Sequence, residues 1–523
     1  MPILPNAFSK RVKDTTLVSC PGKVLVVGGY LVLEKDYEGL VFSTDARFYS
    51  WVTPSSQQDT SNSGFMGVPE SRSNVYNIAV KSAQFENPPW LYMYGDKDGF
   101  ELKECLTATS NTTNKFVLCA LEAAYRYLYL TFANNKQALE KLKMPITIYL
   151  FADNDFYSQR KQLSQCGLEL SFDGLSQLPK CGWIGGHLEE AHKTGLGSSA
   201  CLVSSLIGAV INHFHNQVGV SGTSEEVHRI AQYAHCQAQG KVGSGFDVSA
   251  AIFGSHIYQR FSPSLLSELF ADQENSTFKP SKFLKRMKDD PWDHKIAPVL
   301  LPHRFHMVLG EVDAGSNTPS MVSKVLRWRE NNPDIAKPLW HTLSESNKQV
   351  TKCFSLLYQM FFSDPTSYNN GLNDWISNKV NKVPKASSFK NSTLTVLSEL
   401  FESFQSSRAC LRQISIEAYV PIEPPIQSKL LDSLQDIPEV LIAGVPGAGG
   451  FDAVFAIYID PEATSVEPSP ISNVQSCFDE MASSSFKVGP LLTQEDTKSG
   501  LHNEDLTSPD ANIAFSFLLR TQH

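Results

Sequence analysis

The sequence predicts two structural units, each mixing strands with helices, and three observations support this. A chain of 523 residues is too long for one ordinary hydrophobic core. Short segments rich in Val and Leu occur along the chain together with longer segments of helical periodicity. A charged, proline-bearing stretch at residues 262–302 marks the change from one unit to the next. We therefore expect an N-terminal unit over residues 1–290 and a C-terminal unit over residues 291–523.

The N-terminal unit is expected to open with a strand pair at residues 16–19 and 24–33, joined at Cys20-Pro21-Gly22. The apolar content of both segments favours strands. A third strand is expected at residues 40–52. The other expected elements are strands at 75–80, 90–94 and 146–151 and helices at 116–132, 201–214 and 224–239. Ser224, followed by Glu225 and Glu226, opens the last helix with an N-terminal capping signal.

The C-terminal unit combines a few short strand patterns with long helical ones. The expected strands lie at residues 305–312, 439–443 and 453–459. The expected helices lie at residues 321–329, 335–362 and 393–416. A more polar break is expected at residues 369–391. Beyond Gln494 the tail is polar, and we expect it to be ordered only in part.

Composition limits the classes of function. The net charge of −9 argues against nucleic-acid binding, which needs a basic face. Residues 1–14 hold no apolar signal core, and the longest apolar runs are interrupted or too short to span a bilayer. Ten cysteines without a C-x-x-C pair are typical of reduced thiols. We therefore expect a cytoplasmic protein without nucleic-acid or membrane partners; a peroxisomal location stays open, although Thr521-Gln522-His523 is no S-K-L address.

Residues 193–200, Lys-Thr-Gly-Leu-Gly-Ser-Ser-Ala, join a glycine-rich bend to an apolar helical segment. The two glycines let backbone N–H groups approach an anion closely, and the two serines add hydroxyl groups. The helix that follows directs the positive end of its dipole toward the same place. Lys193 adds a full charge at the mouth. This run predicts a phosphate-binding loop.

The flanks of this loop distinguish it from other phosphate loops. The sequence has no G-x-x-x-x-G-K-[ST], so it is not a Walker loop. A dinucleotide loop of the G-x-G-x-x-A type needs a buried strand before it and an acidic residue about 20 positions later. The polar segment 187–192 and the carboxylate-free segment 216–220 provide neither. A protein-kinase glycine loop is also excluded, because no H-R-D or D-F-G run follows.

Two further glycine motifs accompany this loop, in an order that resembles a known family. The three motifs are Pro21-Gly22-Lys23-Val24 with Gly28-Gly29-Tyr30, then residues 195–200, and then Gly447-Ala448-Gly449-Gly450-Phe451-Asp452. Together they resemble the GHMP small-molecule kinases over residues 17–459. The resemblance implies an α+β fold of two lobes: an ATP-binding N-terminal lobe like domain 2 of ribosomal protein S5, and a ferredoxin-like C-terminal lobe.

Four more segments are similar to the eukaryotic-type phosphomevalonate kinases within this family. They are residues 153–159, residues 240–247, residues 315–320 and Ile422-Glu423-Pro424. This resemblance implies transfer of the γ-phosphoryl group of ATP to 5-phosphomevalonate, which gives ADP and 5-diphosphomevalonate for isoprenoid and sterol synthesis. The small-molecule partners it implies are ATP and 5-phosphomevalonate. The sequence leaves open whether the protein is a monomer or a homodimer.

The resemblance also assigns three catalytic candidates. Lys23 would face the transferring phosphoryl group, and Lys193 would reach the phosphates of donor and acceptor; a solvated lysine is the alternative at each position. Asp247 stands where relatives have a candidate general base. A phosphate acceptor with a second pKa of about 6 is already mostly ionised at neutral pH, so little proton remains to be removed. We therefore expect Asp247 to orient Lys23 or the metal shell, or else to cap the segment 248–253.

ATP and Mg²⁺ are the expected cofactors. The expected ATP-binding residues are Gly195, Leu196, Gly197, Ser198, Ser199 and Ala200. Ser199 is also the expected magnesium ligand, a role compatible with capping the helix. Mevalonate kinases carry a magnesium-binding glutamate where this chain has His235. A second protein ligand for Mg²⁺ is therefore not assigned.

The expected acceptor-binding residues come from both lobes. They are Ser158, Arg160, Ser244, Gly245, Ser316, Thr318, Arg412, Gly447, Ala448 and Gly449. A solvated charge pair is the alternative for Arg160 and Lys161, and a tight strand connection is the alternative for the glycines. Two other functions compete with the leading one. They are another member of the family that acts on an alcohol, such as a mevalonate kinase, and a catalytically silent sugar or nucleotide sensor.

Overall fold

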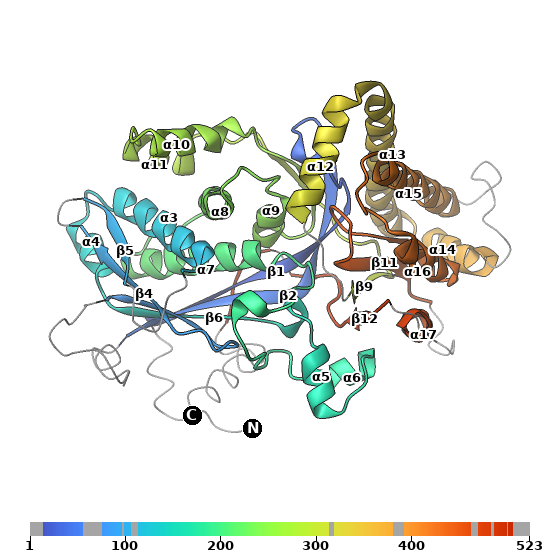
Figure 1. Cartoon of the computed structure of the whole chain (residues 1–523), viewed down its shortest axis with the longest axis horizontal. Helices are drawn as coiled ribbons and strands as arrows, with labels where there is room; N and C mark the ends of the chain where they lie inside the picture. Colours follow the sequence, from blue (N-terminus) through green and yellow to red (C-terminus); the bar gives the residue numbers. More distant parts are fainter. Residues whose placement is uncertain are drawn as a thin grey trace.

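The computed structural model describes residues 14–55, 76–96, 99–105, 113–312, 318–379, 392–461, 469–482, 486–498 and 500–505. Two sheets organise it, a large one in the N-terminal half and a small one in the C-terminal half (Figure 1). Within the described residues, no helix combines the length and the apolar character that crossing a bilayer requires. All ten cysteines are unpaired, as the sequence predicts.

The large sheet has nine strands among the described residues, and its central path runs β13-β1-β2-β6-β3-β4-β5. The strands of this path are β1 (Thr16–Val27), β2 (Glu38–Pro54), β3 (Ile78–Ser82), β4 (Trp90–Gly95), β5 (Glu101–Glu104), β6 (Ile146–Ala152) and β13 (His502–Asn503). A side branch adds β7 (His256–Gln259), which pairs with β2, and β8 (Lys295–Pro298). Only the β3–β6 pair is parallel within this described sheet.

The expected strand pair at the start of the chain is wrong. One strand, β1, runs through Pro21 and Gly22, and the opposite strand accommodates the irregularity, since Pro21 pairs with Arg47 and Lys23 already pairs with Ser43. Proline lacks an N–H group and is tolerated at such a bulge. The strand ends at Val27, because Gly28 has φ 109° and Tyr30 has φ 65°. Residues Leu31–Leu33 form a short 3₁₀ turn, η2, instead of strand.

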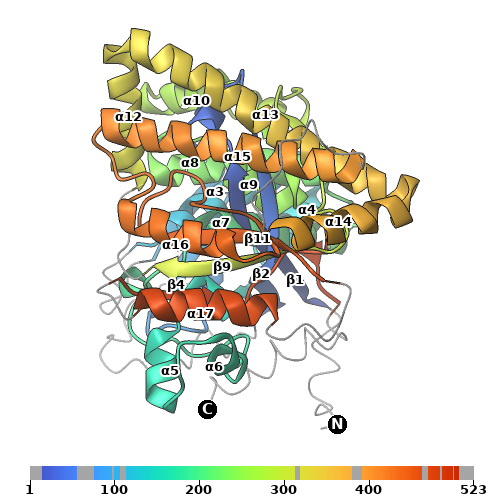
Figure 2. The same ribbon diagram turned by 90° about the vertical axis from the view of Figure 1, so that its right-hand side faces the viewer.

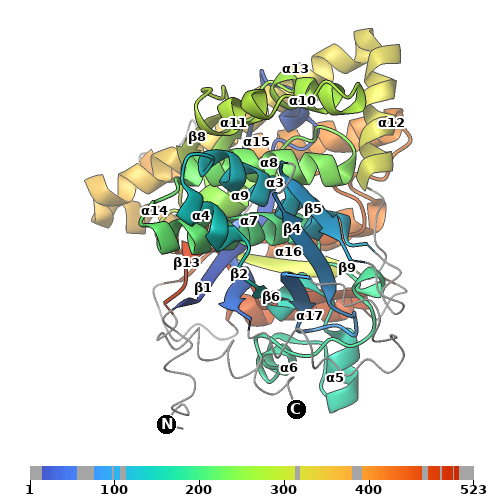
Figure 3. The same ribbon diagram turned by 90° about the vertical axis from the view of Figure 1, so that its left-hand side faces the viewer.

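Helices cover one face of the large sheet (Figure 1). The central one, α7 (Ser198–Val218), packs on β1 and β2 and is buried along most of its length. It is flanked by α3 (Lys115–Thr131), α8 (Ser224–Gln239) and α9 (Phe246–Phe253). The N-cap of α8 is Thr223, one residue before the expected Ser224, and it forms a capping box with Glu226. Figure 3 looks onto the outer helices α4 (Lys136–Leu142), α10 (Ser264–Glu274) and α11 (Pro280–Lys288). Two short helices, α5 (Arg160–Cys166) and α6 (Phe172–Ser176), lie apart from this layer.

The small sheet is antiparallel and has the order β10-β11-β9-β12. Its strands are β9 (Phe305–Val312), β10 (Val440–Gly444), β11 (Ala453–Ile459) and β12 (Val488–Leu491). Helices pack on both faces, because alternate residues of β11 join two different cores. One core includes α13 (Pro333–Ser363) and α15 (Ser392–Glu417). The other includes α16 (Pro425–Asp436) and α17 (Pro470–Ala482), onto which Figure 2 looks. The expected two-lobed α+β fold is confirmed.

The expected polar break at residues 369–391 is wrong in its first part. Residues Pro365–Lys379 form α14, which buries Tyr368, Leu372 and Trp375 on one helical face. This i, i+4, i+7 spacing stabilises a helix even though polar residues surround it. Residues 380–391 lie outside the described part of the chain.

The described end of the chain returns to the large sheet. After β12, Thr493 and Gln494 bind Asp45, and β13 pairs with β1. The buried Arg47 guanidinium forms an ion pair of 2.9 Å with Asp496 and lies 3.7 Å from Glu504. The large sheet therefore takes strands from both sides of residue 290, and the lobe limits of 1–290 and 291–523 stay a prediction.

Candidate active site

The glycine-rich bend leads directly into the first turn of α7. Gly195 and Gly197 have φ values of 82° and 84°, a left-handed conformation that favours glycine. Gly197 is the N-cap of α7, so the unpaired N–H groups and the positive end of the helix dipole face the bend. This backbone is suited to hold an anion without any charged side chain.

Lys23 is fixed against the bend by both its main chain and its side chain. Its N–H donates to the Leu196 carbonyl at 3.1 Å, and its Nζ donates to the Gly195 carbonyl at 2.8 Å. A Cβ on Gly197 would lie 3.1 Å from Lys23 Cε, so only glycine leaves the lysine undisturbed. The structure therefore brings the first and second glycine motifs into direct contact.

A second helix N-terminus meets the same place. Gly245, with φ 81°, is the N-cap of α9, and Asp247 lies in its first turn. The ring of Phe246 lies 5.5 Å below Lys23 Nζ, a cation–π distance. One Asp247 oxygen accepts the Val248 N–H at 2.9 Å. The other Asp247 oxygen lies 4.0 Å from His235 Nε2.

The pKa of Lys23 depends on its burial and on the charges around it. Burial lowers the pKa of its ammonium group, while the nearby Asp247 and Asp452 carboxylates oppose that shift. Burial raises the pKa of the Cys201 thiol to about 12, so this thiol stays neutral and adds no charge at neutral pH. The approach of phosphate oxygens would add further negative charge and favour the ammonium form.

His235 stands between Ser199 and Asp247. Its Nε2 lies 3.2 Å from Ser199 Oγ, and the imidazole is almost fully buried. Burial lowers the pKa of His235, and the Asp247 charge opposes that shift only in part. The departure from the family pattern thus places a neutral imidazole beside the expected magnesium ligand.

The third glycine motif closes on the first one. Gly447 donates its N–H to the Leu25 carbonyl at 3.0 Å, and Tyr30 Oη donates to the Ala448 carbonyl at 2.8 Å. A Cβ on Gly29 would lie 2.1 Å from the Gly447 carbonyl oxygen. A Cβ on Gly449 would lie 2.2 Å from the Ile422 carbonyl oxygen. These close approaches explain why the motif is rich in glycine.

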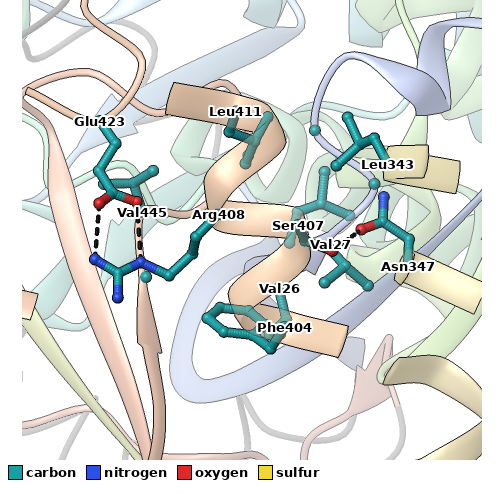
Figure 4. A pocket seen from close by; sticks show the side chains of 15 residues that line it. Val26, Val27, Leu343, Asn347, Phe404, Ser407, Arg408, Leu411, Glu423 and Val445 are labelled. Atoms are coloured by element: carbon teal, nitrogen blue, oxygen red, sulfur yellow. Dashed lines mark hydrogen bonds and ion pairs between the residues drawn. The ribbon is translucent and has the colours of Figure 1, made fainter. Parts of the chain in front are cut away.

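Behind this motif lies a small cavity of about 20 Å³ between β1, α13 and α15 (Figure 4). Arg408 on its wall is buried and pairs with both oxygens of Glu423, at 3.1 and 2.7 Å. These charge-assisted bonds hold the pKa of Glu423 below its usual value even though burial raises it. Arg412 shares the same carboxylate at 3.1 Å and is more exposed. The pair anchors the turn whose neighbour, Ile422, supports Gly449 and Gly450.

Two of the expected acceptor-binding residues meet a carboxylate from the other lobe. Glu311 on β9 accepts from the Ser158 hydroxyl at 3.0 Å and forms an ion pair of 2.8 Å with Arg160 Nε. Burial raises the pKa of Glu311, and the Arg160 charge is the main opposing effect. The pairing links α5 and the segment before it to the small sheet.

The other predicted residues have these positions. Lys193 is exposed and forms a backbone bridge with Tyr157, and Lys161 is also exposed. The Ser244 carbonyl accepts from Tyr258 Oη at 2.8 Å. Ser316 lies outside the described residues, and Thr318 begins α12 (Thr318–Asn331) with its side chain outside the described part.

The sequence reasoning missed Glu311 and the Arg408–Glu423 pair. For Glu311 a signal existed, because it is the only carboxylate in the mostly apolar strand at residues 305–312. A buried charge usually has a partner. Within the segment 153–159 only Ser158 was expected to bind the acceptor, and Asp153 and Asp155 accept from the backbone N–H groups of Arg47, Leu492 and Thr493.

A glycine-lined bend at a helix N-terminus, joined by a half-buried lysine and closed by a second glycine loop, is the arrangement of a GHMP small-molecule kinase. The family model of the GHMP kinases N terminal domain matches residues 161–255 of this chain. The fold is similar to the solved structure of the Streptococcus pneumoniae phosphomevalonate kinase in complex with phosphomevalonate and AMPPNP. That likeness has a TM-score of 0.55 at 13% identity, and covers 92% of this chain and 99% of that chain.

Curated relatives narrow the class further. The peroxisomal phosphomevalonate kinase of Arabidopsis thaliana is 32% identical over 92% of this chain and 94% of its own length. The phosphomevalonate kinase of Aspergillus fumigatus is 34% identical over 89% of this chain and 90% of its own length. The chain belongs to the phosphomevalonate kinase family, and it is a phosphotransferase that uses ATP.

Proposed function

We propose that the site described above transfers the γ-phosphoryl group of ATP to 5-phosphomevalonate, with Lys23 as its central cation. The products are ADP and 5-diphosphomevalonate, in the mevalonate route to isoprenoids and sterols. The observation that carries the proposal is the Lys23 Nζ–Gly195 bond, in a chain whose relatives at 31–34% identity are phosphomevalonate kinases. This hydrogen bond holds the positive charge of Lys23 directly beside the backbone that we propose binds the phosphates.

Charge stabilisation is the main task of such a site. ATP and a phosphorylated carboxylic acid together carry roughly seven negative charges. The N-termini of α7 and α9 and the ammonium group of Lys23 converge on one place. These groups would stabilise charge on the transferring phosphoryl group without reorganising during the reaction. Lys193, exposed at the mouth of the bend, would meet the phosphates of donor and acceptor.

The reaction forms one P–O bond and breaks another. An oxygen of the acceptor phosphate attacks the γ-phosphorus, and the bond from that phosphorus to the β,γ-bridging oxygen breaks, with its electrons leaving on ADP. The acceptor oxygen is mostly ionised at neutral pH, so the step needs no general base. Asp247 would act by favouring the ammonium form of Lys23, as its effect on the lysine pKa indicates.

The residues present fit a magnesium ion. Mg²⁺ prefers hard oxygen ligands and usually keeps phosphates and waters in its shell. Ser199 Oγ and the Asp247 carboxylate provide such oxygens on either side of His235. We propose that these two residues hold Mg²⁺ together with the ATP phosphates. The ion would neutralise charge on the β- and γ-phosphates when bound.

The acceptor would bind between the lobes. We propose that Arg160 and Ser158, positioned by Glu311, contact its phosphate or carboxylate, together with Ser244, Gly245 and the Gly447–Gly449 loop. The Arg160 Nη2 atom has no hydrogen-bond partner among the described residues, so its N–H groups can donate to an anionic ligand. Ser316, Thr318 and Arg412 complete the proposed set.

Release of ADP measured with four acceptors tests the function. We expect turnover with 5-phosphomevalonate and none with mevalonate, 5-diphosphomevalonate or galactose. Turnover with mevalonate instead would indicate an alcohol kinase and restore a need for a base. Turnover with galactose alone, or binding without any turnover, would contradict the proposal in favour of a sugar kinase or a sensor.

We further propose that ATP and 5-phosphomevalonate are the only ligands the reaction needs besides Mg²⁺, and that the enzyme works in a reducing compartment. Ten unpaired cysteines support the second point. The cytoplasm is the proposed location; the Arabidopsis relative is named as peroxisomal. Microscopy of the tagged full chain tests the location, and sedimentation distinguishes a monomer from a homodimer.

A further inference from the structure

A cluster of three metal-binding side chains lies outside the active site. Glu225 and His228 stand one turn apart at the start of α8, and His294 comes from the segment just before β8. One ligand atom from each of them lies within 4.8 Å of the other two. The rings of His228 and His294 are 4.8 Å apart.

Both imidazoles are buried and incompletely bonded. His228 is 0% exposed, and the side chain of His294 is 7% exposed. Neither Nδ1 atom has a hydrogen-bond partner among the described residues. An unpaired polar atom in the interior is costly, and a bound ligand is one way to satisfy it. Glu225, which is 45% exposed, connects the cluster to solvent.

We propose that Glu225, His228 and His294 form a site for a divalent transition-metal ion of the zinc type. Two imidazoles and one carboxylate are a ligand set that zinc accepts, with water in the fourth position. The ion would replace the 3.5 Å contact between His294 Nε2 and Glu225 Oε1. Tetrahedral zinc needs ligand atoms about 3.4 Å apart. Side-chain rotations that move these atoms by about an ångström would bring them to that separation.

Arg229 opposes the site electrostatically. Its Nε lies 3.9 Å from Glu225 Oε2, while its Nη1 donates to the Lys288 carbonyl at 3.0 Å. The guanidinium competes with a cation for the same carboxylate. Removal of this charge should therefore tighten metal binding, whereas loss of any ligand should weaken it. This opposite pair of effects distinguishes a metal site from a structural histidine cluster.

Gln232 connects the cluster to the active site. Its Nε2 donates to the Gly245 carbonyl at 2.7 Å and lies 3.0 Å from His228 Nε2. An amide nitrogen can only donate, so His228 Nε2 accepts and the ring proton sits on Nδ1. A metal on Nδ1 would move that proton to Nε2, where it would face the Gln232 amide hydrogens. Gln232 would then have to turn, which breaks its bond to the N-cap of the helix that carries Asp247.

Binding of Zn²⁺ and Co²⁺ to the nucleotide-free full chain tests the site. We expect one ion per chain, with the visible absorption of four-coordinate Co²⁺. Glu225→Gln and His294→Gln should each weaken binding by more than about tenfold, and Arg229→Gln should strengthen it. His341→Gln removes an exposed imidazole on α13 and should change nothing. We expect the first two variants to fold, because they alter groups near the surface or in a loop. A melting curve of each variant checks this.

The outcomes separate this proposal from the proposed function, because binding is read without substrates. Binding that survives both ligand variants, or that is lost in Asp247→Asn, would overturn it; the second result would place the ion in the active site. The Gln232 connection predicts that Zn²⁺ slows turnover at the concentration that fills the site, and that His294→Gln removes this inhibition. Full activity of the zinc-loaded enzyme would contradict the connection.

Discussion

The phosphate loop and the acceptor side of the site are built in different ways. The loop is a main-chain device, because two left-handed glycines and a helix N-terminus provide its donors. The acceptor side is a side-chain device, in which Ser158 and Arg160 meet Glu311 from another sheet. A site made of backbone leaves its mark in the local sequence. A site made of distant ion pairs becomes visible only when the chain is folded.

The largest expected effect tests the one side chain that the loop depends on. Lys23→Met removes the ammonium group that donates to Gly195 and keeps much of the apolar stem. Turnover should fall by about 10²–10³-fold, the typical cost of one preorganised charge-stabilising donor. Steady-state kinetics with both substrates measures this, with circular dichroism as the folding control. A fall of less than about tenfold would mean that the backbone alone carries the site.

A substitution at Asp153 should change the pH dependence of stability strongly, without a direct effect on turnover. Burial raises the pKa of Asp153 to about 7, far above its value of about 3.9 in an unfolded chain. A raised carboxyl pKa gives stability that is present at low pH and lost as the pH rises through about 4 to 7. Asp153→Asn should flatten this pH dependence by on the order of 3 kcal/mol between pH 4 and pH 8. Denaturant titrations of both proteins at each pH measure it; parallel curves would contradict the assignment.

Two glycines of α7 test whether the loop needs its geometry or only its flexibility. Gly197 and Gly219 cap the two ends of the same helix, with φ 84° and φ 71°. Alanine at either position should cost about 1–2 kcal/mol of stability, the strain of a left-handed residue. Only Gly197→Ala should also lower turnover, because its Cβ would press on Lys23, while a Cβ at Gly219 meets nothing within 4 Å. Equal kinetics in the two variants would show that the close approach to Lys23 is unimportant.

The acceptor side is tested through Glu311. Glu311→Gln keeps the shape of the side chain and removes the charge that holds Arg160. We expect the KM for 5-phosphomevalonate to rise about tenfold while the KM for ATP stays unchanged, since the loop does not contact Glu311. A double-mutant cycle with Arg160→Ala isolates the pair. Equal changes in both KM values would mean that the variant disturbs the lobes as a whole.

The difference between the two regions also explains what the sequence could predict. The strand at residues 305–312 and the helix at 224–239 were predicted correctly because their periodicity is local. The turn at Pro21-Gly22 was wrong, because the partner strand β2 absorbs the irregularity. Glu311 was missed because its pairing with Arg160 depends on how β9 lies against α5, which no local pattern encodes. The position of His235 was noticed, but its approach to Ser199 and Asp247 depends on the packing of α8 against α9.

The smallest expected effect concerns Arg412, whose side chain is 38% exposed, beside Arg408, whose side chain is 3% exposed. Both bind Glu423, but solvent screens the outer pair, so Arg412→Ala should cost less than about 1 kcal/mol of stability. We expect the KM for 5-phosphomevalonate to rise by about threefold, because Arg412 is proposed to contact the acceptor. Arg408 keeps both Glu423 oxygens bound in this variant, so a KM that does not change would mean that Arg412 only supports the Glu423 turn. The expected rise would instead mean that the acceptor side contains a cation that its contact with Glu423 conceals, and the contrast with the backbone-built loop would become sharper.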